Sequence, residues 1–385
     1  MSRSVVVDPS TIGPRDVLAL RVRGLGGALT AVAALRALRR TADDHRLVFA
    51  GGLEVGRLLA QHGVVDAVLP VRELGPLPAM AGGHLAVDLH GRGAAGRAVL
   101  RATAPRAVVG FSYPCAQEPG PAWRPREHEV LRWCRLVATM GGQPTLEDMR
   151  LRPRAGPDAG PPARREGGRT VIIHPGASSG ARRWGAARWA AVARHLVEDG
   201  HHVVLTGGAT ERRLCAQIEE SVGRPLRERV ANICARLALD RFAAAVAKAC
   251  LVLSSDTGVA HLATALAVPS VTLYGPTPPA SCGPIIDHDL HAVLWVGQGH
   301  EHGDRHGLVI DPRLDAIGVA TVVNAARERL AGCTGHVPAP REAATTSPAV
   351  TSHPKATPPP KVTLAAPDRR AASAGIPQAR MASHL

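Results

Sequence analysis

Short apolar segments alternate with longer segments of helical periodicity along two separate stretches of this chain, and this pattern restricts the fold more than any other feature. In the first stretch the expected helices span 28–40 and 54–62, and the expected strands span 16–23, 45–50, 64–70, 84–90 and 107–111. Strands that are separated by helices pair in parallel, with helices on both faces of the sheet. Residues 1–150 are therefore predicted to form an α/β, Rossmann-like domain.

The same alternation returns after residue 169. The expected strands are 170–174, 202–206, 251–254 and 270–274, and the expected helices are 187–199, 211–222, 241–249 and 258–267. This pattern predicts a second Rossmann-like domain over residues 170–332. Residues 151–169 are rich in Pro, Gly and Arg without periodicity, as expected for a linker. Residues 333–385 have few large apolar side chains, so we predict a disordered tail.

Composition narrows the class of protein. No run of about 18 apolar residues is present, so no membrane span is predicted. The N-terminus does not have the pattern of a signal peptide. The seven cysteines are an odd number without a C-x-x-C pair, which favours reduced thiols and a cytoplasmic location.

The formal net charge of +14 raises the question of nucleic-acid binding. The positive charge comes almost entirely from Arg, and no basic stripe interleaved with aromatic residues is present. We therefore predict no nucleic-acid partner. Anionic ligands, such as nucleotide phosphates, and peripheral contact with the inner face of an anionic membrane both remain compatible with the charge.

The first candidate motif follows the strand expected at 170–174. His174, Gly176, Ser178 and Ser179 belong to the segment H-P-G-A-S-S-G, and Arg182 follows it. Small residues let backbone amides approach an anion, and Arg pairs well with a diphosphate. The alternative is an ordinary strand-to-helix loop with surface arginines.

The second motif follows the next strand, where Thr206, Gly207 and Gly208 precede Glu211. A carboxylate at this helix start could accept hydrogen bonds from both ribose hydroxyls of a nucleotide. The alternative is an acidic residue that is favoured there by the helix dipole alone.

The third motif is the most informative. Asp256, Thr257, Gly258 and His261 come at the end of a strand and within the first turn of a helix. Ligands of open α/β sheets bind at the carboxyl ends of the strands. The alternative is an Asp helix cap together with a packed histidine.

Together these motifs, with the later G-P-T-x-P turn, resemble glycosyltransferase family 9, the ADP-heptose:lipopolysaccharide heptosyltransferase-like enzymes, over roughly residues 16–330. The resemblance implies a GT-B fold and metal-independent, inverting transfer from a sugar nucleotide, with ADP-heptose as the expected donor. It places the donor on the C-terminal domain and a glycan or glycoconjugate acceptor on the N-terminal domain. No cofactor is expected, and His300, His302, Asp304 and His306 are interpreted as a solvated loop rather than a metal site.

The chain departs from the family pattern at two places. Arg182 stands where the family usually has Lys, so a planar fork replaces a point charge. The first loop reads Gly24-Leu25-Gly26-Gly27, whereas the family normally has Asp at the fourth position as the proposed base. His90, or Asp88, is then the candidate for removing the proton of the acceptor. The alternative is that Asp88 caps a turn and His90 lines the pocket.

Three other functions stay open from the sequence. A nicotinamide-dependent enzyme is suggested by Gly24-x-Gly26 after a strand, although Leu29 occupies the third glycine position. A sugar-nucleotide-binding protein with impaired catalysis is suggested by Gly27. An NDP-sugar 2-epimerase would share the fold. The oligomeric state is not predicted.

Overall fold

The computed structural model describes residues 5–112, 120–151 and 169–332. Most of the predicted linker, residues 152–168, and the whole predicted tail lie outside the described residues. The domain boundaries therefore stay predictions.

The N-terminal half contains a parallel five-stranded sheet with the order β3-β2-β1-β4-β5. Its strands are β1 (Asp16–Leu20), β2 (Arg46–Gly51), β3 (Ala67–Pro70), β4 (Leu85–Asp88) and β5 (Ala107–Val109). Its helices are α1 (Leu25–Leu29), α2 (Val32–Thr41), α3 (Leu53–Gln61), α4 (Ala94–Arg101) and α5 (Glu129–Ala138), with 3-10 helices at Pro9–Thr11 and Leu146–Met149.

The C-terminal half contains a parallel six-stranded sheet with the order β11-β10-β9-β6-β7-β8. Its strands are β6 (Thr170–His174), β7 (His202–Leu205), β8 (Val230–Asn232), β9 (Leu251–Ser255), β10 (Ser270–Leu273) and β11 (His291–Leu294). Its helices are α6 (Ala186–Glu198), α7 (Arg212–Val222), α8 (Leu239–Ala247), α9 (Gly258–Ala265), α10 (Pro279–Cys282), α11 (Pro312–Asp315) and α12 (Val319–Gly332). The 3-10 helices are η3 (Gly180–Arg182), η4 (Ala209–Glu211) and η5 (Leu226–Arg229).

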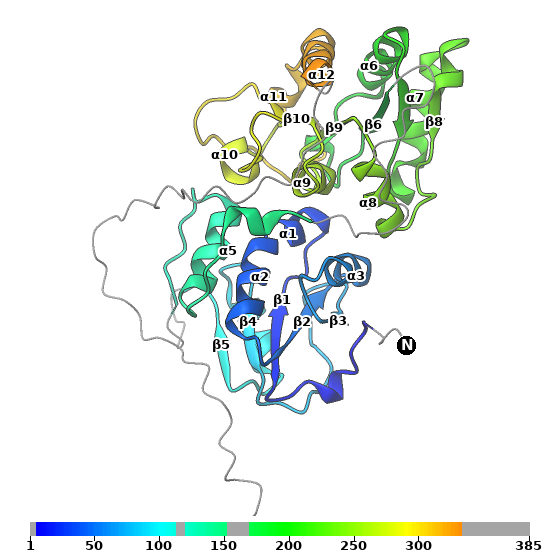
Figure 1. The fold of residues 1–385 in the computed structure, drawn as a ribbon. Helices are drawn as coiled ribbons and strands as arrows, with labels where there is room; N and C mark the ends of the chain where they lie inside the picture. Colours follow the sequence, from blue (N-terminus) through cyan, green and yellow to red (C-terminus); the bar gives the residue numbers. More distant parts are fainter. Residues whose placement is uncertain (1–4, 113–119, 152–168, 333–385) are drawn as a thin grey trace, which may run out of the picture.

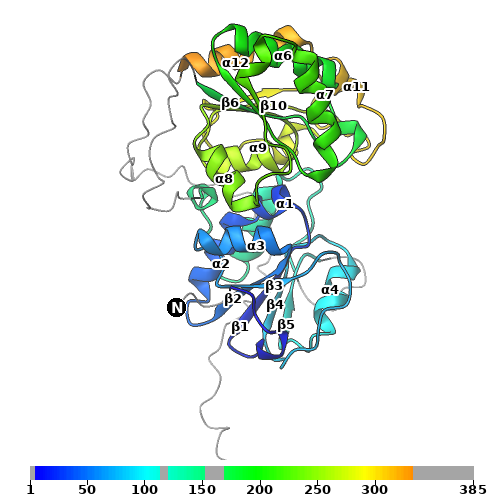
Figure 2. The ribbon, with the colours of Figure 1, turned by 90° about the vertical axis from the view of Figure 1, so that its right-hand side faces the viewer.

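Both faces of β1 are covered, as the alternation of the sequence predicts. Val17 packs in the cluster that contains Leu35 of α2, whereas Leu18 packs in the cluster that contains Leu100 of α4. Figure 2 shows α2 and α4 on opposite sides of the N-terminal sheet. The predicted α/β class with two parallel sheets is confirmed.

The two sheets lie one above the other, with α1 and α9 at the junction (Figure 1). α8 lies over α3, and α5 lies beside α10 (Figures 1 and 2). One apolar cluster runs through this junction, because it contains Val17 of β1 as well as Ile172 and Val252 of the upper sheet. The junction is therefore built from apolar packing, and the loops at the carboxyl ends of both sheets meet there.

The predicted single helix 28–40 is wrong in detail, because the chain forms α1 and α2 instead. The segment Gly24–Gly27, expected as a loop, contributes the cap and first turn of α1. The carbonyl oxygen of Gly27 accepts hydrogen bonds from the Arg21 side chain and from Thr30 Oγ1. This tertiary contact occupies a carbonyl that a continuous helix would use, so the helix breaks after Thr30.

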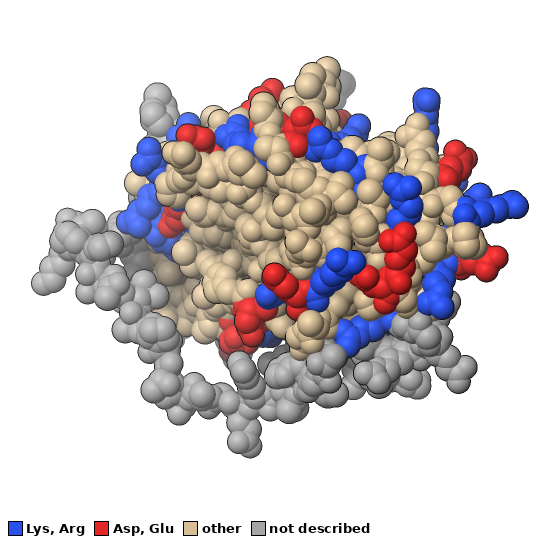
Figure 3. All heavy atoms as spheres, turned by 90° about the horizontal axis from the view of Figure 1, so that it is seen from above, with Lys and Arg blue, Asp and Glu red and all other residues tan. Residues whose placement is uncertain are grey.

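Helices α4, α5 and α12 and the short edge strands β8 and β11 have no counterpart in the sequence prediction. No helix in the described ranges combines the length and apolar character needed to cross a membrane. On the face seen from above in Figure 3, basic and acidic side chains interleave around an area of uncharged residues. This face therefore carries no continuous basic patch.

The central strand β9 gives a test of the upper core. Leu253 is fully buried between β6 and β10, so Leu253→Ala should lower the free energy of unfolding by about 2–5 kcal/mol. Urea unfolding measures this loss. The matched control is Leu308→Ala, because Leu308 is 92% exposed and its truncation should change stability by less than about 0.5 kcal/mol. Equal losses in both variants would contradict this description of the core.

Candidate functional site

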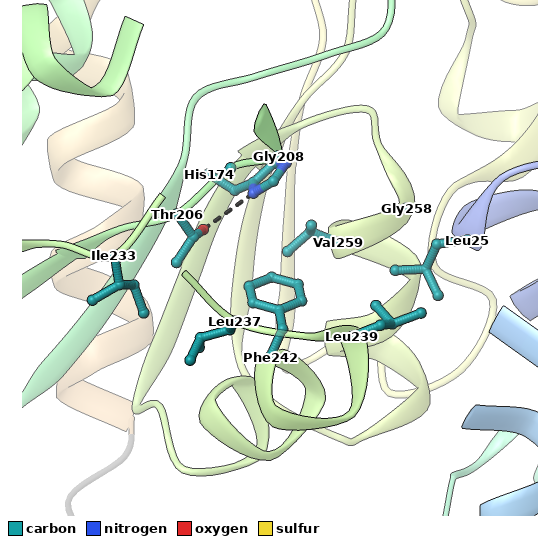
Figure 4. A pocket seen from close by; sticks show the side chains of 11 residues that line it. Leu25, His174, Thr206, Gly208, Ile233, Leu237, Leu239, Phe242, Gly258 and Val259 are labelled. Carbon is teal, nitrogen blue, oxygen red and sulfur yellow. Dashed lines mark hydrogen bonds between the residues drawn. The ribbon is translucent and has the colours of Figure 1, made fainter. Parts of the chain in front are cut away.

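A pocket of about 310 Å³ lies where β6 and β7 end, beneath the amino end of α9. Figure 4 shows Phe242 at its centre and Leu25 entering from the N-terminal half. Its floor is apolar, and its polar atoms come from two strand ends and the glycine turn after β7. The lining residues are Leu25, His174, Thr206, Gly207, Gly208, Ile233, Leu237, Leu239, Phe242, Gly258 and Val259.

His174 and Thr206 form the polar edge of this pocket. They become neighbours because Ile173 and Leu205 are paired across β6 and β7. His174 Nδ1 lies 3.1 Å from Thr206 Oγ1 (Figure 4). Burial lowers the pKa of His174 to about 4 because it disfavours the charged ring. His174 is therefore neutral near pH 7 and serves as a hydrogen-bonding group.

Glu211 lies against both glycine loops. A Cβ on Gly207 would come within 2.8 Å of Glu211 Cβ, and a Cβ on Gly176 would overlap the Glu211 side chain. The carboxylate accepts hydrogen bonds from Gly208 N at 2.7 Å and from Thr210 Oγ1 at 2.9 Å. Glu211 thus lies beside the pocket residues Gly207 and Gly208 and caps the start of η4, while its contact with a ribose stays a prediction.

Arg182 connects the first motif to the third. It donates to the carbonyl oxygen of Asp256 at 2.8 Å and to Ser178 Oγ. It also lies 3.4 Å from Ser179 Oγ and 3.9 Å from the Asp256 carboxylate. Ser179 in turn donates to the carbonyl oxygen of Arg305 at 2.8 Å. The structure therefore brings these four side chains to one place, beside the amino end of α9.

Thr257, rather than Asp256, caps α9: its hydroxyl accepts from Val259 N at 3.4 Å. Asp256 is 5% exposed and lies just before the cap. Burial lowers the pKa of His261, while the charges of Asp256 and Glu129 oppose this shift. His261, one turn into α9, is therefore a largely neutral imidazole between the two halves.

The loop Gly24–Gly27 packs directly against α9. A Cβ on Gly26 would lie 2.8 Å from His261 Cδ2 and 3.2 Å from Gly258 Cα. A Cβ on Gly258 would lie 2.8 Å from Gly26 N. The two backbones are in direct contact here. Helix α9 therefore fills the space beside the glycine turn in which a nicotinamide cofactor would have to bind.

The two candidate base residues, Asp88 and His90, have different surroundings. Asp88 is 2% exposed, and its carboxylate accepts from His90 N at 2.9 Å. Burial raises the pKa of Asp88 to about 6, against the effect of that hydrogen bond. Burial and then the charges of Arg23 and Arg21 lower the pKa of His90 to about 4. Asp88 therefore caps its own turn, and His90 is a neutral, half-buried ring.

Two functional candidates were missed from the sequence. Arg21 is fully buried directly after β1, and Glu129 begins α5 and pairs with it at 2.6 Å. A charged residue at the end of an apolar strand is a signal for Arg21. No local pattern identifies Glu129, because its partner lies 108 positions away.

No group of three or more potential metal ligands is found among the residues that the structure describes. In the histidine-rich loop, Asp304 Oδ1 accepts from His306 N at 2.9 Å, so this carboxylate caps a turn.

Residues 116–305 match the family described as "Glycosyltransferase family 9 (heptosyltransferase)". The predicted resemblance to family 9 is confirmed. The match covers the pocket residues of the C-terminal half, Arg182 and the start of α9, but not Leu25, whereas the sequence predicted a wider range of about 16–330.

Curated heptosyltransferases of family 9 type align with part of the chain. "Lipooligosaccharide heptosyltransferase 2" of Haemophilus influenzae is 31% identical over 144 residues, which are 36% of this chain and 42% of the relative. "Lipopolysaccharide heptosyltransferase 2" of Escherichia coli K12 is 31% identical over 128 residues, or 33% of this chain and 36% of the relative. The aligned part thus spans less than half the length of these relatives.

A solved structure extends the likeness to the whole fold. The E. coli ADP-heptose lps heptosyltransferase II superposes with a TM-score of 0.66 at 17% identity, over 82% of this chain and 99% of that chain. The predicted GT-B fold is therefore confirmed.

The contact between Gly26 and α9 gives a test with a matched glycine. Gly26→Ala should lower the free energy of unfolding by about 1–3 kcal/mol, because the new methyl group displaces His261 or α9. Gly24→Ala is the control, since no atom lies within 4 Å of its added Cβ. Thermal unfolding distinguishes them. A Gly26→Ala variant as stable as Gly24→Ala would show that the halves do not meet here.

The buried Asp88 predicts a pH dependence. Its pKa is raised in the folded state from 3.8 to about 6, so the folded protein holds this proton more tightly than the unfolded chain. Stability from this group is present below pH 3.8 and is lost as the pH rises to about 6, by about 3 kcal/mol. Asp88→Asn should remove that loss in urea unfolding between pH 4 and 7. An unchanged pH slope in the variant would assign it to another group.

Proposed function

We propose that this chain is a glycosyltransferase that moves heptose from ADP-heptose, with inversion, to a glycan or glycoconjugate of the cell envelope. One observation carries the proposal: an apolar pocket at the strand ends adjoins Arg182 and the amino end of α9, and both face the N-terminal half. The family match and the names of the curated relatives support the same activity.

The pocket suits the nucleoside part of the donor. Ligand pockets range from about 300 to 1,000 Å³, so a pocket of about 310 Å³ accommodates a nucleoside rather than a complete sugar nucleotide. Phe242 and the leucines supply an apolar surface for a base, and Thr206 and His174 supply polar atoms. Glu211 would accept the ribose hydroxyls at the rim. A related E. coli heptosyltransferase was solved with ADP, which supports adenine as the base.

The diphosphate would lie between Arg182 and the amino end of α9. The guanidinium forks toward Ser178 and Asp256, and the helix amides of Gly258 and Val259 add partial positive charge. These groups stabilise the negative charge that develops on the leaving ADP as the bond to the anomeric carbon breaks. This arrangement needs no metal ion. Asp256 and the neutral His261 would contact the sugar hydroxyls.

The acceptor would enter from the N-terminal half, beside Gly24–Gly27 and His90. A reaction of this kind takes place where the sugar nucleotide is made, so we also propose a cytoplasmic location and an acceptor presented at the inner membrane face. The net charge of +14 is compatible with an anionic surface.

A second candidate is a sugar-nucleotide-binding protein with impaired catalysis. Position 27 is the reason: a Cβ there would lie 2.5 Å from Arg23 Cβ, so this backbone has no room for the carboxylate expected in the family. This candidate predicts binding of ADP-heptose without release of ADP.

The proposal predicts that Phe242 and Arg182 contribute separately to donor binding. Phe242→Ala should weaken ADP binding about tenfold through lost apolar contact. Arg182→Ala should weaken ADP by about 10- to 100-fold and adenosine much less, because the guanidinium meets only the diphosphate. Titration calorimetry with ADP and with adenosine measures both effects. Arg194→Ala, an exposed arginine on α6, is the control.

Turnover is measured as ADP release from ADP-heptose with lipopolysaccharide that lacks heptose as the acceptor. Release that depends on this acceptor, with a matching mass increase of the lipopolysaccharide, supports the transferase. Tight ADP-heptose binding without release would favour the binding protein. If Arg182→Ala weakened adenosine binding as much as ADP binding, Arg182 would not contact the diphosphate, and the assigned diphosphate position would be wrong.

A further inference from the structure

The buried guanidinium of Arg21 is the centre of the acceptor side. It donates to the carbonyl oxygens of Gly27 and Leu89 and to Thr30 Oγ1, the last at 3.0 Å. Its carbon lies 4.4 Å from the centroid of the Trp133 ring. The side chain has no exposed surface. A buried cation requires a carboxylate nearby, since an unpaired charge in the interior is strongly destabilising.

Glu129 is the carboxylate that meets Arg21, at 2.6 Å from its NH2 atom. It is the first residue of α5, and His128 before it lies 3.0 Å from the carbonyl oxygen of Gly283 in the C-terminal half. This contact anchors the start of α5 at the junction. Unlike Asp88, Glu129 has 27% of its side chain exposed. A ligand can therefore reach it.

Glu129 also faces the donor side. The charge of Glu129 opposes the lowering of the His261 pKa by burial, so the two groups lie near each other, and Arg23 adds a positive charge near the carboxylate. His261 lies on α9, one turn from Thr257 and beside Gly26. The carboxylate thus belongs to the space between the amino end of α9 and the loop Gly24–Gly27.

The position of Gly27 relates Glu129 to the Asp that family 9 normally has at position 27 and that this chain lacks. A Cβ added to Gly27 would lie 3.5 Å from Arg21 NH2. This is the nitrogen that Glu129 already occupies. An acidic side chain at position 27 and the side chain of Glu129 would therefore meet the same guanidinium, from α1 in one case and from α5 in the other.

We propose that Glu129 is the general base of this protein, standing in for the absent carboxylate at position 27; the inference rests on the proposed transferase function. Its carboxylate accepts the proton of the acceptor hydroxyl. The acceptor oxygen forms a bond to the anomeric carbon as the bond from that carbon to the diphosphate oxygen breaks. The bonding electrons leave with ADP, and Glu129 ends the step protonated.

The electrostatics are compatible with this role. Burial raises the pKa of Glu129, but the charge of Arg21 and its hydrogen bond outweigh burial and hold the pKa below its usual value. Glu129 is therefore ionised before the reaction. A carboxylate of this kind is a weak base, but the acceptor hydroxyl becomes acidic as its oxygen bonds to an oxocarbenium-like carbon, so a late proton transfer suffices.

Glu129→Gln is the decisive variant, because the amide keeps an oxygen for Arg21 and removes the base. We expect kcat for ADP release from ADP-heptose, with heptose-deficient lipopolysaccharide, to fall at least about 100-fold. KM for ADP-heptose should stay unchanged, whereas the melting temperature should fall, because the buried Arg21 loses its neutralising charge. The assay is therefore run well below the melting temperature of the variant. The matched control is Glu127→Gln, since Glu127 pairs with Arg135 at 2.6 Å, two residues away from the site. Its kcat should equal that of the wild type.

A second measurement separates a base from a residue that only positions Arg21. Azide is a nucleophile without a proton to lose, so ADP release from ADP-heptose with azide should be as fast in Glu129→Gln, which keeps an oxygen for Arg21, as in the wild type. For Glu129→Gln, a retained kcat with the lipopolysaccharide acceptor, or a lost reaction with azide, would overturn the role of Glu129, while wild-type turnover keeps the proposed function. If the wild type released no ADP with the lipopolysaccharide acceptor or with azide, both the proposed transferase function and the role of Glu129 would be wrong.

Discussion

The approach of two glycine backbones at the junction controls the rest of the site. Gly26 of α1 and Gly258 of α9 lie so close that a Cβ on either would meet backbone atoms of the other helix within about 3 Å. This contact brings the amino end of α9, which favours anions, up against the loop of the N-terminal half. It also lets Leu25 close one side of the pocket. A larger residue at either position would separate the groups that must act on one molecule.

The two halves of the site are built in different ways, and this decides what the sequence could predict. In the C-terminal half the polar groups of the pocket lie at strand ends, because His174 is the last residue of β6 and Thr206 follows β7. Parallel pairing then brings them together without long-range information. Both sheets and the class of fold could therefore be anticipated from local patterns, and the resemblance to family 9 implied that Arg182 and Asp256 both lie at the donor site.

The acceptor side depends on contacts between distant segments, and here the sequence prediction was incomplete. Glu129 comes from a helix that the periodicity did not reveal, and it reaches Arg21 across 108 positions. The apolar floor was missed as well, because Phe242 and Leu237 look like ordinary core residues. The break between α1 and α2 was missed because a tertiary contact at the Gly27 carbonyl causes it.

The buried Arg21 explains why the site still contains a carboxylate although position 27 has none. A guanidinium with no exposed surface must be neutralised, and Arg23 occupies the space into which a side chain at position 27 would extend. The start of α5 is the place from which Glu129 reaches the same nitrogen. Its anchoring residue, His128, contacts the opposite half, so the position of the carboxylate is coupled to the closure of the junction. Charge balance inside the N-terminal half and assembly of the site between the halves therefore depend on one helix start.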